Sequence, residues 1–165
     1  MAEGNDTSYQ GGYSGGASYQ GGADRGSRSG ASGATAAGDP IFDRVPPHDD
    51  DAEMAVLGGM LMSKDAIGEV SQTIDVTDFY QPKHQTIYNA IIDLFSASQP
   101  VDVVLVANQL LADGNLEKVG GADYLHSLVA SVPTAANAMY YAEIVHQRAI
   151  LRNVIAAGTK IAQLG

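Results

Sequence analysis

The sequence predicts an all-α protein: a small helical head followed by a projecting antiparallel helical hairpin, with a disordered N-terminal tail. Helix-forming residues dominate after residue 48. The stretch from residue 134 to 165 has no proline and its first glycine is Gly158, so it can form one helix of roughly 40 Å at about 1.5 Å per residue. The first 39 residues are mainly Gly, Ser, Ala, Tyr and Gln, which do not supply a hydrophobic core.

The composition excludes several classes of protein. The chain has 165 residues and no cysteine, which rules out a disulfide scaffold and agrees with a reducing cytoplasm. No apolar run reaches the ~18 residues that span a membrane, and the N-terminus lacks the basic-then-apolar pattern of a signal peptide. We therefore expect a cytoplasmic protein with no membrane partner.

The charge balance is acidic, with a formal net charge of −10. From Arg44 to Ala136 the only basic residues are Arg44, Lys64, Lys83 and Lys118. A surface of this kind repels phosphate groups, which argues against direct duplex binding by this region. The remaining basic grouping lies on the predicted C-terminal helix, at Arg148, Arg152 and Lys160.

Residues 1–44 are predicted to form the disordered tail. Too few of their side chains are apolar to offset the entropy lost on ordering. Gly12–Gly16 formally matches the G-x-S-x-G pattern of serine hydrolases. That motif needs a strand before it and a helix after it. A Gly- and Ser-rich tract provides neither, so we interpret the match as chance.

The first predicted helix lies within Asp49–Leu61, after a stiff Pro46-Pro47 segment. Its three leading aspartates stand where a helix favours negative charge. Asp50 and Glu53 have the spacing of a capping box, so we expect Glu53 to be structural and not catalytic. Gly58-Gly59 interrupts the apolar stripe, and each glycine lowers helix stability by about 1 kcal/mol relative to alanine. A pair at this position predicts that another backbone approaches closely there.

The next segments complete the predicted head, which spans residues 45–121. Asp65–Ile74 has the apolar spacing of a short helix, and the aromatics of Asp78-Phe79-Tyr80 are expected to fill the core. Pro82 suits the first turn of the following helix. On that helix His84 heads an apolar stripe, so we expect a hydrogen-bonded packing residue and not a ligand or base.

The segment after Pro100 is ambiguous. The valines of Val101–Val106 favour a strand, whereas Asp102 as an N-cap, followed by apolar residues at helical spacing, favours a helix. We predict a helix that ends at Gly114.

The last 44 residues, 122–165, are predicted to form the hairpin and the start of a linker to an absent ATPase domain. A short helix over Ala122–Val132 and a long one from Thr134 are joined by a tight turn, so they should pack antiparallel. The short helix cannot cover the long one from about Leu151 onward. That overhang predicts an oligomer interface, formed by Tyr141, Ile144, Val145, Leu151 and Ile155.

Two arginines one turn apart on this helix, Arg148 and Arg152, are candidates for polar contacts to DNA or to the carboxylates of a partner. The alternative is that both are solvated flanks of a packed helix.

Pro46-Pro47-His48, Ala52-Glu53 and Val56–Leu61 resemble the opening of the N-terminal domain of the bacterial replicative DNA helicase, the DnaB family. The resemblance covers about residues 45–160 and leaves out the tail. Later landmarks follow in the family's order, and they include Asp78-Phe79-Tyr80, His84, Pro100-Val101-Asp102, Gly120-Gly121, Tyr124-Leu125, Pro133, Ala135-Ala136-Asn137 and Ile144-Val145.

The resemblance implies a role in DNA replication. In that family the domains form a collar, a trimer of dimers, over a hexameric motor, and primase docks on the collar. The motor is a separate domain that follows through a linker, uses ATP and Mg²⁺, and makes most of the contacts with DNA. We therefore expect this chain to be an N-terminal fragment of an ATP-dependent helicase, with self, primase and possible helicase-loader contacts.

The chain itself lacks the patterns of an enzyme. Gly158-Thr159-Lys160 is not preceded by the glycine spacing of a P-loop. The histidines show no metal-ligand spacing, and no nucleophile–base pair can be drawn. We predict no catalytic, cofactor or metal site in this fragment. The alternative function is a stand-alone helical adaptor, such as a helicase loader or the helicase-binding domain of a primase.

Overall fold

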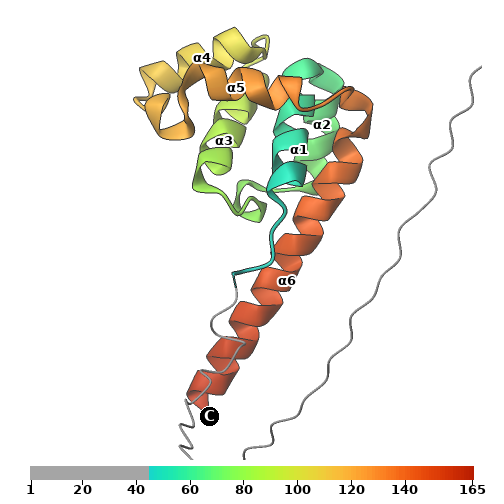
Figure 1. Ribbon diagram of the computed structural model, residues 1–165, viewed down its shortest axis with the longest axis vertical. Coiled ribbons are helices and arrows are strands. Elements are labelled where there is room, and N and C mark those ends of the chain that lie inside the picture. The colour runs from blue at the N-terminus through green and yellow to red at the C-terminus, as the bar shows by residue number, and fades with distance from the viewer. Residues whose placement is uncertain (1–44) are drawn as a thin grey trace, which may run out of the picture. The chain divides into compact units, whose positions relative to one another are not determined.

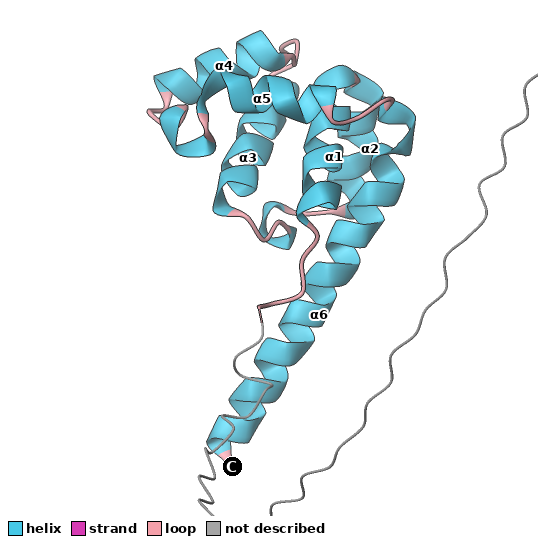
Figure 2. Cartoon of the chain, viewed as in Figure 1, coloured by secondary structure: helices cyan, strands magenta, loops and turns pink. Residues whose placement is uncertain are grey.

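The computed structural model describes residues 45–165, and within them all regular structure is helical (Figures 1 and 2). The predicted all-α class is therefore confirmed. The predictions for the tail, including the hydrolase-like motif, lie outside the described residues. The helices are α1 (Asp50–Met62), α2 (Lys64–Thr73), η1 (Val76–Asp78), α3 (Pro82–Ser96), α4 (Val103–Ala112), η2 (Glu117–Val119), α5 (Gly121–Ala130), η3 (Ala135–Asn137) and α6 (Ala138–Leu164).

Helix α1 is the centre of the fold. It packs against α2, α3, α5 and α6, and α4 lies against α3 and α5. A helix surrounded in this way must be apolar on most of its circumference, and from Ala55 to Leu61 every residue of α1 is buried. We call residues 50–149, which share this core, the globular body.

Helix ends follow local side-chain chemistry. Asp49, and not Asp50, caps α1, because its Oδ1 accepts a hydrogen bond from the backbone N–H of Ala52 at 2.9 Å. The capping-box prediction for Asp50 and Glu53 is therefore wrong. Asp102 caps α4 as predicted, accepting from Leu105 N–H at 2.8 Å, so the helical choice for this segment is confirmed.

The glycine pair of α1 confirms the predicted close approach. A Cβ on Gly58 would overlap the carbonyl oxygen of Leu128 in α5. A Cβ on Gly59 would lie 2.9 Å from the Cβ of Ala138, the first residue of α6. The missing side chains of α1 thus let two later helices come close to it.

The predicted antiparallel packing of the last two helices is corrected by the structure. Helices α5 and α6 both pack on α1 and do not run along one another (Figure 1). Their connection includes η3, which also contacts α1, so the chain changes direction instead of reversing. The predicted boundary at residues 121 and 122 also passes through one core, since Leu125, Ala142 and Val145 are buried with residues of α1.

Helix α6 nevertheless projects, as predicted. Its first half lies against α1 and α2, and its second half extends beyond the other helices (Figure 1). We call residues 150–164 the projecting half of α6.

Candidate interaction surface on helix α6

The two halves of α6 have different surroundings. In the first half, Ala138, Ala142, Val145 and Ala149 form a row that is buried against the other helices of the globular body. These residues are small, so the helix lies close to its neighbours. In the projecting half only Arg152 and Thr159 are partly buried. The exposed large apolar side chains there are Ile150, Leu151, Val154, Ile155, Ile161 and Leu164.

The structure separates the five residues predicted for the oligomer interface. Leu151 and Ile155 are 44% and 46% exposed and lie on the projecting half. Tyr141 and Ile144 are partly buried and pack against the core of the chain itself. Val145 is only 1% exposed, so its place in the predicted interface is corrected: it is a core residue. The interface role of the other four stays a prediction.

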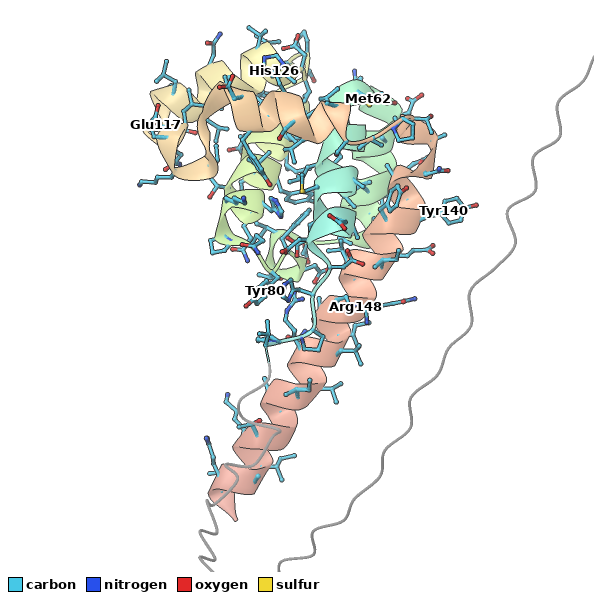
Figure 3. The ribbon with its side chains drawn as sticks, in the orientation of Figure 1. Met62, Tyr80, Glu117, His126, Tyr140 and Arg148 are labelled. Atoms are coloured by element: carbon cyan, nitrogen blue, oxygen red, sulfur yellow. The ribbon has the colours of Figure 1, made fainter. Side chains whose placement is uncertain are left out.

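The two arginines also differ. Arg148 is exposed and points away from the globular body (Figure 3). Arg152 donates from Nη1 to the carbonyl oxygen of Pro47 at 2.8 Å and from Nη2 to that of Asp78 at 2.6 Å. Arg152 therefore holds two distant segments of its own chain, and the expectation of a contact to DNA or a partner is corrected for this residue.

Arg152 belongs to a larger cluster around the start of the described chain. We call Val45–His48 the strap, because it runs from α1 onto the projecting half of α6. The ring of His48 stacks on the ring of Tyr80 with centroids 4.0 Å apart. The guanidinium of Arg152 lies 5.6 Å from the centroid of the Tyr80 ring. Tyr80 was expected in the core, but it lies at this surface junction, whereas Phe79 is fully buried as predicted.

A hydrogen bond from α6 to η1 supports the same junction. His146 Nδ1 lies 2.9 Å from Asp78 Oδ2, so Asp78 meets α6 through both its backbone and its side chain. Sequence reasoning missed this cluster because its members lie up to 105 positions apart. The signal that could have found it is an arginine on the core side of α6, in line with the buried Val145 and Ala149.

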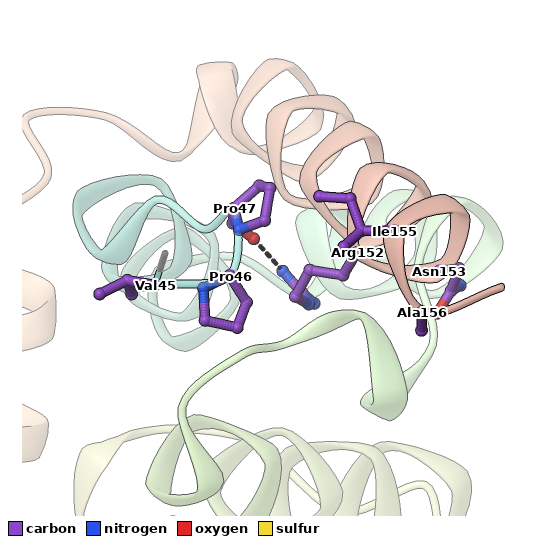
Figure 4. Close-up of a pocket in the computed structure, with 7 residues that line it drawn as sticks. All are labelled: Val45, Pro46, Pro47, Arg152, Asn153, Ile155 and Ala156. Carbon is purple, nitrogen blue, oxygen red and sulfur yellow. Dashed lines mark hydrogen bonds between the residues drawn. The ribbon is translucent and has the colours of Figure 1, made fainter. Parts of the chain in front are cut away.

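A groove opens between the strap and the projecting half of α6 (Figure 4). Its volume is about 540 Å³. The dashed bond from Arg152 to Pro47 crosses between its two sides. Most of its lining is apolar, and the lining residues are Val45, Pro46, Pro47, Arg152, Asn153, Ile155 and Ala156.

Glu53, His84 and Tyr124 form a closed hydrogen-bond network that reaches into the interior. Glu53 accepts hydrogen bonds from the backbone N–H groups of Tyr80 at 2.6 Å and Gln81 at 3.3 Å. Its Oε2 lies 2.6 Å from His84 Nδ1, and His84 Nε2 lies 2.7 Å from the hydroxyl of Tyr124. Glu53 and His84 are each 1% exposed.

This network has the residue types of a catalytic relay but no access for a substrate. Its polar atoms are consumed by one another and by backbone groups, which is what a buried carboxylate needs in order to stay in the interior. The prediction that His84 is a hydrogen-bonded packing residue is confirmed. Glu53 is structural as expected, but through long-range contacts and not through a helix cap.

Within residues 45–165, no cluster of three or more His, Asp or Glu side chains is arranged to hold a metal ion. No helix in that range has the length and hydropathy of a membrane span. Most of the exposed large apolar side chains of the described residues lie on the projecting half of α6.

Comparison with known proteins shows which proteins the sequence and fold resemble. The model of the family described as DnaB-like helicase N terminal domain matches residues 45–147. The replicative DNA helicase DnaB of Leifsonia xyli subsp. xyli is 52% identical over 123 residues, which are 74% of this chain and 27% of that protein. The replicative DNA helicase DnaB of Mycobacterium leprae is 52% identical over 124 residues, 75% of this chain and 20% of that protein. The chain thus spans between 20% and 27% of the length of these relatives.

Solved structures show the same likeness. The N-terminal domain of DnaB helicase from Mycobacterium tuberculosis superposes with a TM-score of 0.71 at 52% identity, over 72% of this chain and 85% of that one. The N-terminal domain of DnaB helicase from Helicobacter pylori, described together with its interactions with primase, gives a TM-score of 0.60 over 69% of this chain and 89% of that one. At 21% identity the second likeness concerns the fold alone.

Proposed function

The chain belongs to the family of DnaB-like helicase N-terminal domains, and we propose that it serves as the N-terminal collar of a hexameric replicative DNA helicase. In this role it joins neighbouring subunits and docks primase during unwinding of the replication fork. The alternative of a stand-alone adaptor has less support, because the relatives at 52% identity are named replicative helicases.

The observation that carries the proposal is the exposed apolar surface of the projecting half of α6. Leu151 and Ile155 lie one turn apart and share a face of the helix. A contiguous exposed apolar surface of this kind is typical of a protein–protein interface. A second copy of the same chain offers a matching surface, and identical patches that pair around a two-fold axis form the commonest oligomers.

Primase is the second proposed partner. The Helicobacter pylori domain is described with primase interactions, and we extend that partner to this chain as part of the proposal. The acidic surface supports it in kind: residues 45–165 carry six Lys and Arg against fourteen Asp and Glu, so a partner with a basic face would be attracted at long range.

The motor activity is proposed to lie outside this chain. The sequence contains no P-loop, the motif with which such motors hold ATP and Mg²⁺. We propose that both are held by a separate domain of the parent protein, which also makes most contacts with DNA. A helicase loader is a possible further partner of the collar, and the proposal places the assembly in the bacterial cytoplasm, where the chromosome is copied.

Isothermal titration with the helicase-binding domain of a bacterial primase tests the docking role. We expect saturable binding that weakens as the salt concentration rises, because acidic surface charge contributes to the encounter. The catalytic domain of the same primase is the control and is expected not to bind. If neither domain binds at high micromolar concentration, the docking part of the proposal fails.

A further inference from the structure

The projecting half of α6 has a second face, distinct from that of Leu151. Ala142, Ala149 and Ala156 follow one another every seven residues, so they lie in one row along the helix. The first two are buried against the globular body. Beside the next turn, Arg152 binds Pro47 of the strap. Ala156 then lines the groove and is exposed.

The packing of the chain against this row therefore stops at the strap, although the row continues. The groove marks that point: the strap prolines form one wall and Ile155 and Ala156 form the other (Figure 4). Val45, the first described residue, lies at its rim and is 69% exposed. The peptide bond that joins Val45 to the preceding residue therefore lies next to the groove.

The sequence just upstream suits such a surface. Ile41 and Phe42 are the only Ile, Leu, Val or Phe residues among the first 44. Phe42 and Ile41 are three and four positions before Val45. An extended chain of that length spans at most about 14 Å. That reach corresponds to roughly nine residues of helix at about 1.5 Å each, so the pair can lie against the turns of α6 that follow Arg152.

Charge agrees with this placement. Asp39 and Asp43 flank the apolar pair and Arg44 follows, so the segment keeps an excess of one carboxylate. After Glu143, α6 carries no carboxylate, and its basic residues in the projecting half are Arg152 and Lys160. In a chain with a net charge of −10, this is an unusual stretch to which an acidic segment can bind without repulsion.

We propose that Ile41 and Phe42 dock in the groove of their own chain and extend the strap along the Ala156 face of α6. Their apolar side chains fill the space between the prolines and Ile155, and Asp43 lies near the basic residues of the helix. Ile155 borders both surfaces: the docked segment covers its Ala156 side and leaves Leu151 open, so the segment acts beside a subunit interface and does not replace it.

Nuclear Overhauser measurements on the full 165-residue chain test the contact directly. We expect cross-peaks between the Phe42 ring and the methyl groups of Ala156 and Ile155, and their loss in Phe42→Ser. Mixed samples of labelled and unlabelled chain separate the sources, since isotope-filtered spectra distinguish a contact within one molecule from a contact between two. Cross-peaks that arise solely between chains, or none at all, overturn the proposal.

Thermal unfolding of the full chain provides a second readout. Ile41→Ser with Phe42→Ser is expected to lower the melting temperature by about 4 °C, whereas Tyr9→Ser with Tyr13→Ser, a matched pair farther from the strap, leaves it unchanged.

A double-mutant cycle completes the test. Ala156→Glu is expected to cause no further fall in the melting temperature of the Ile41/Phe42 variant, because either change removes the same contact. Ala157→Glu, on a different side of α6, controls for helix charge. Additive effects of Ala156→Glu, or an unchanged melting temperature in the Ile41/Phe42 variant, contradict the docking. None of these readouts depends on primase, and the isotope-filtered spectra separate the contact within one chain from self-association, so the test stands apart from the proposed function.

Discussion

At the scale of single residues, Glu53 shows how a charge is kept in the core. Its two oxygens accept from two backbone N–H groups and contact His84. Within the described residues, no buried side-chain nitrogen or oxygen lacks a hydrogen-bond partner. The sequence around Glu53 is the same whether its side chain caps α1 or binds a backbone group 27 residues away. Only the fold distinguishes these two roles.

The network predicts a large effect of a nearly isosteric change. Glu53→Gln keeps the shape but replaces one acceptor oxygen by an NH₂ group, which faces N–H donors. We expect the free energy of unfolding to fall by about 1–3 kcal/mol, the range for an unsatisfied buried group. Urea unfolding measures this change, with Glu69→Gln at an exposed position of α2 as the control. Equal stability of the two variants would show that the network contributes little.

The buried phenol of Tyr88 predicts that the stability of the protein depends on pH in the alkaline range. Burial, together with the nearby carboxylates of Asp75 and Asp78, raises the pKa of its phenol above the ordinary tyrosine value. Its hydroxyl donates to the carbonyl oxygen of Ile74 at 3.0 Å. The unfolded chain therefore loses this proton at a lower pH than the folded chain does. The contribution of Tyr88 to the free energy of unfolding is thus complete below about pH 10 and declines above it.

The corresponding variant is Tyr88→Phe. At pH 8 we expect it to be less stable than the wild type by about 1 kcal/mol, the net contribution of one hydrogen bond. The difference should shrink as the pH rises above about 10, because only the wild type loses stability by ionising this hydroxyl. Tyr140→Phe, on the exposed surface of α6, is the control. A difference that is constant with pH would mean that Tyr88 ionises equally in both states.

At the scale of elements, the apolar spacing and the ends of helices could be predicted from the sequence, but the helices against which each one packs could not. Asp102 and Gly114 bound α4 through local chemistry, so the sequence predicts its type correctly. The partner of α5 depends on which surface lies nearest in space. Both α5 and α6 find the glycines of α1, and this long-range fit outweighs the short connection that suggested a hairpin.

The glycine pair gives the prediction at this scale. Gly58→Ala improves the helix propensity of α1 by about 1 kcal/mol, yet the new Cβ meets the Leu128 carbonyl and a methyl group of Val132. We expect a net loss of about 1–3 kcal/mol from overpacking.

Gly68→Ala is the matched control, because Gly68 is also helical and a Cβ added there would have nothing within 4 Å of it. This change should stabilise the protein by about 0.5–1 kcal/mol. Chemical denaturation compares the two, and a stabilising Gly58→Ala would show that α5 can move away without loss.

At the scale of the whole molecule, the sequence predicted a long helix with an uncovered end, and the structure has one. The prediction failed where side chains of α6 turn toward the chain's own body, as Val145 and Arg152 do. Helical spacing alone shows which residues share a face. It does not show which face the globular body takes, because that choice depends on the small-residue row beginning at Ala138.

The last prediction concerns assembly through the open side of α6. Burying a leucine contributes about 1.5–3 kcal/mol, and two copies bury it twice, which helps to offset the loss of translational and rotational freedom on association. Leu151→Asp should therefore convert an oligomer into a monomer. Ile144 is a poorer choice for this test, because it packs partly against the core and a charge there would also disturb folding.

Sedimentation equilibrium over a concentration series measures the change, and circular dichroism checks that the variant remains folded. Val104→Asp provides the matched control, since Val104 is an exposed apolar residue on α4, away from α6. We expect the control to associate like the wild type. A wild-type chain that stays monomeric at several hundred micromolar would refute assembly through this face. If both variants dissociate, the loss reflects added negative charge on an already acidic chain and not the removal of a specific contact.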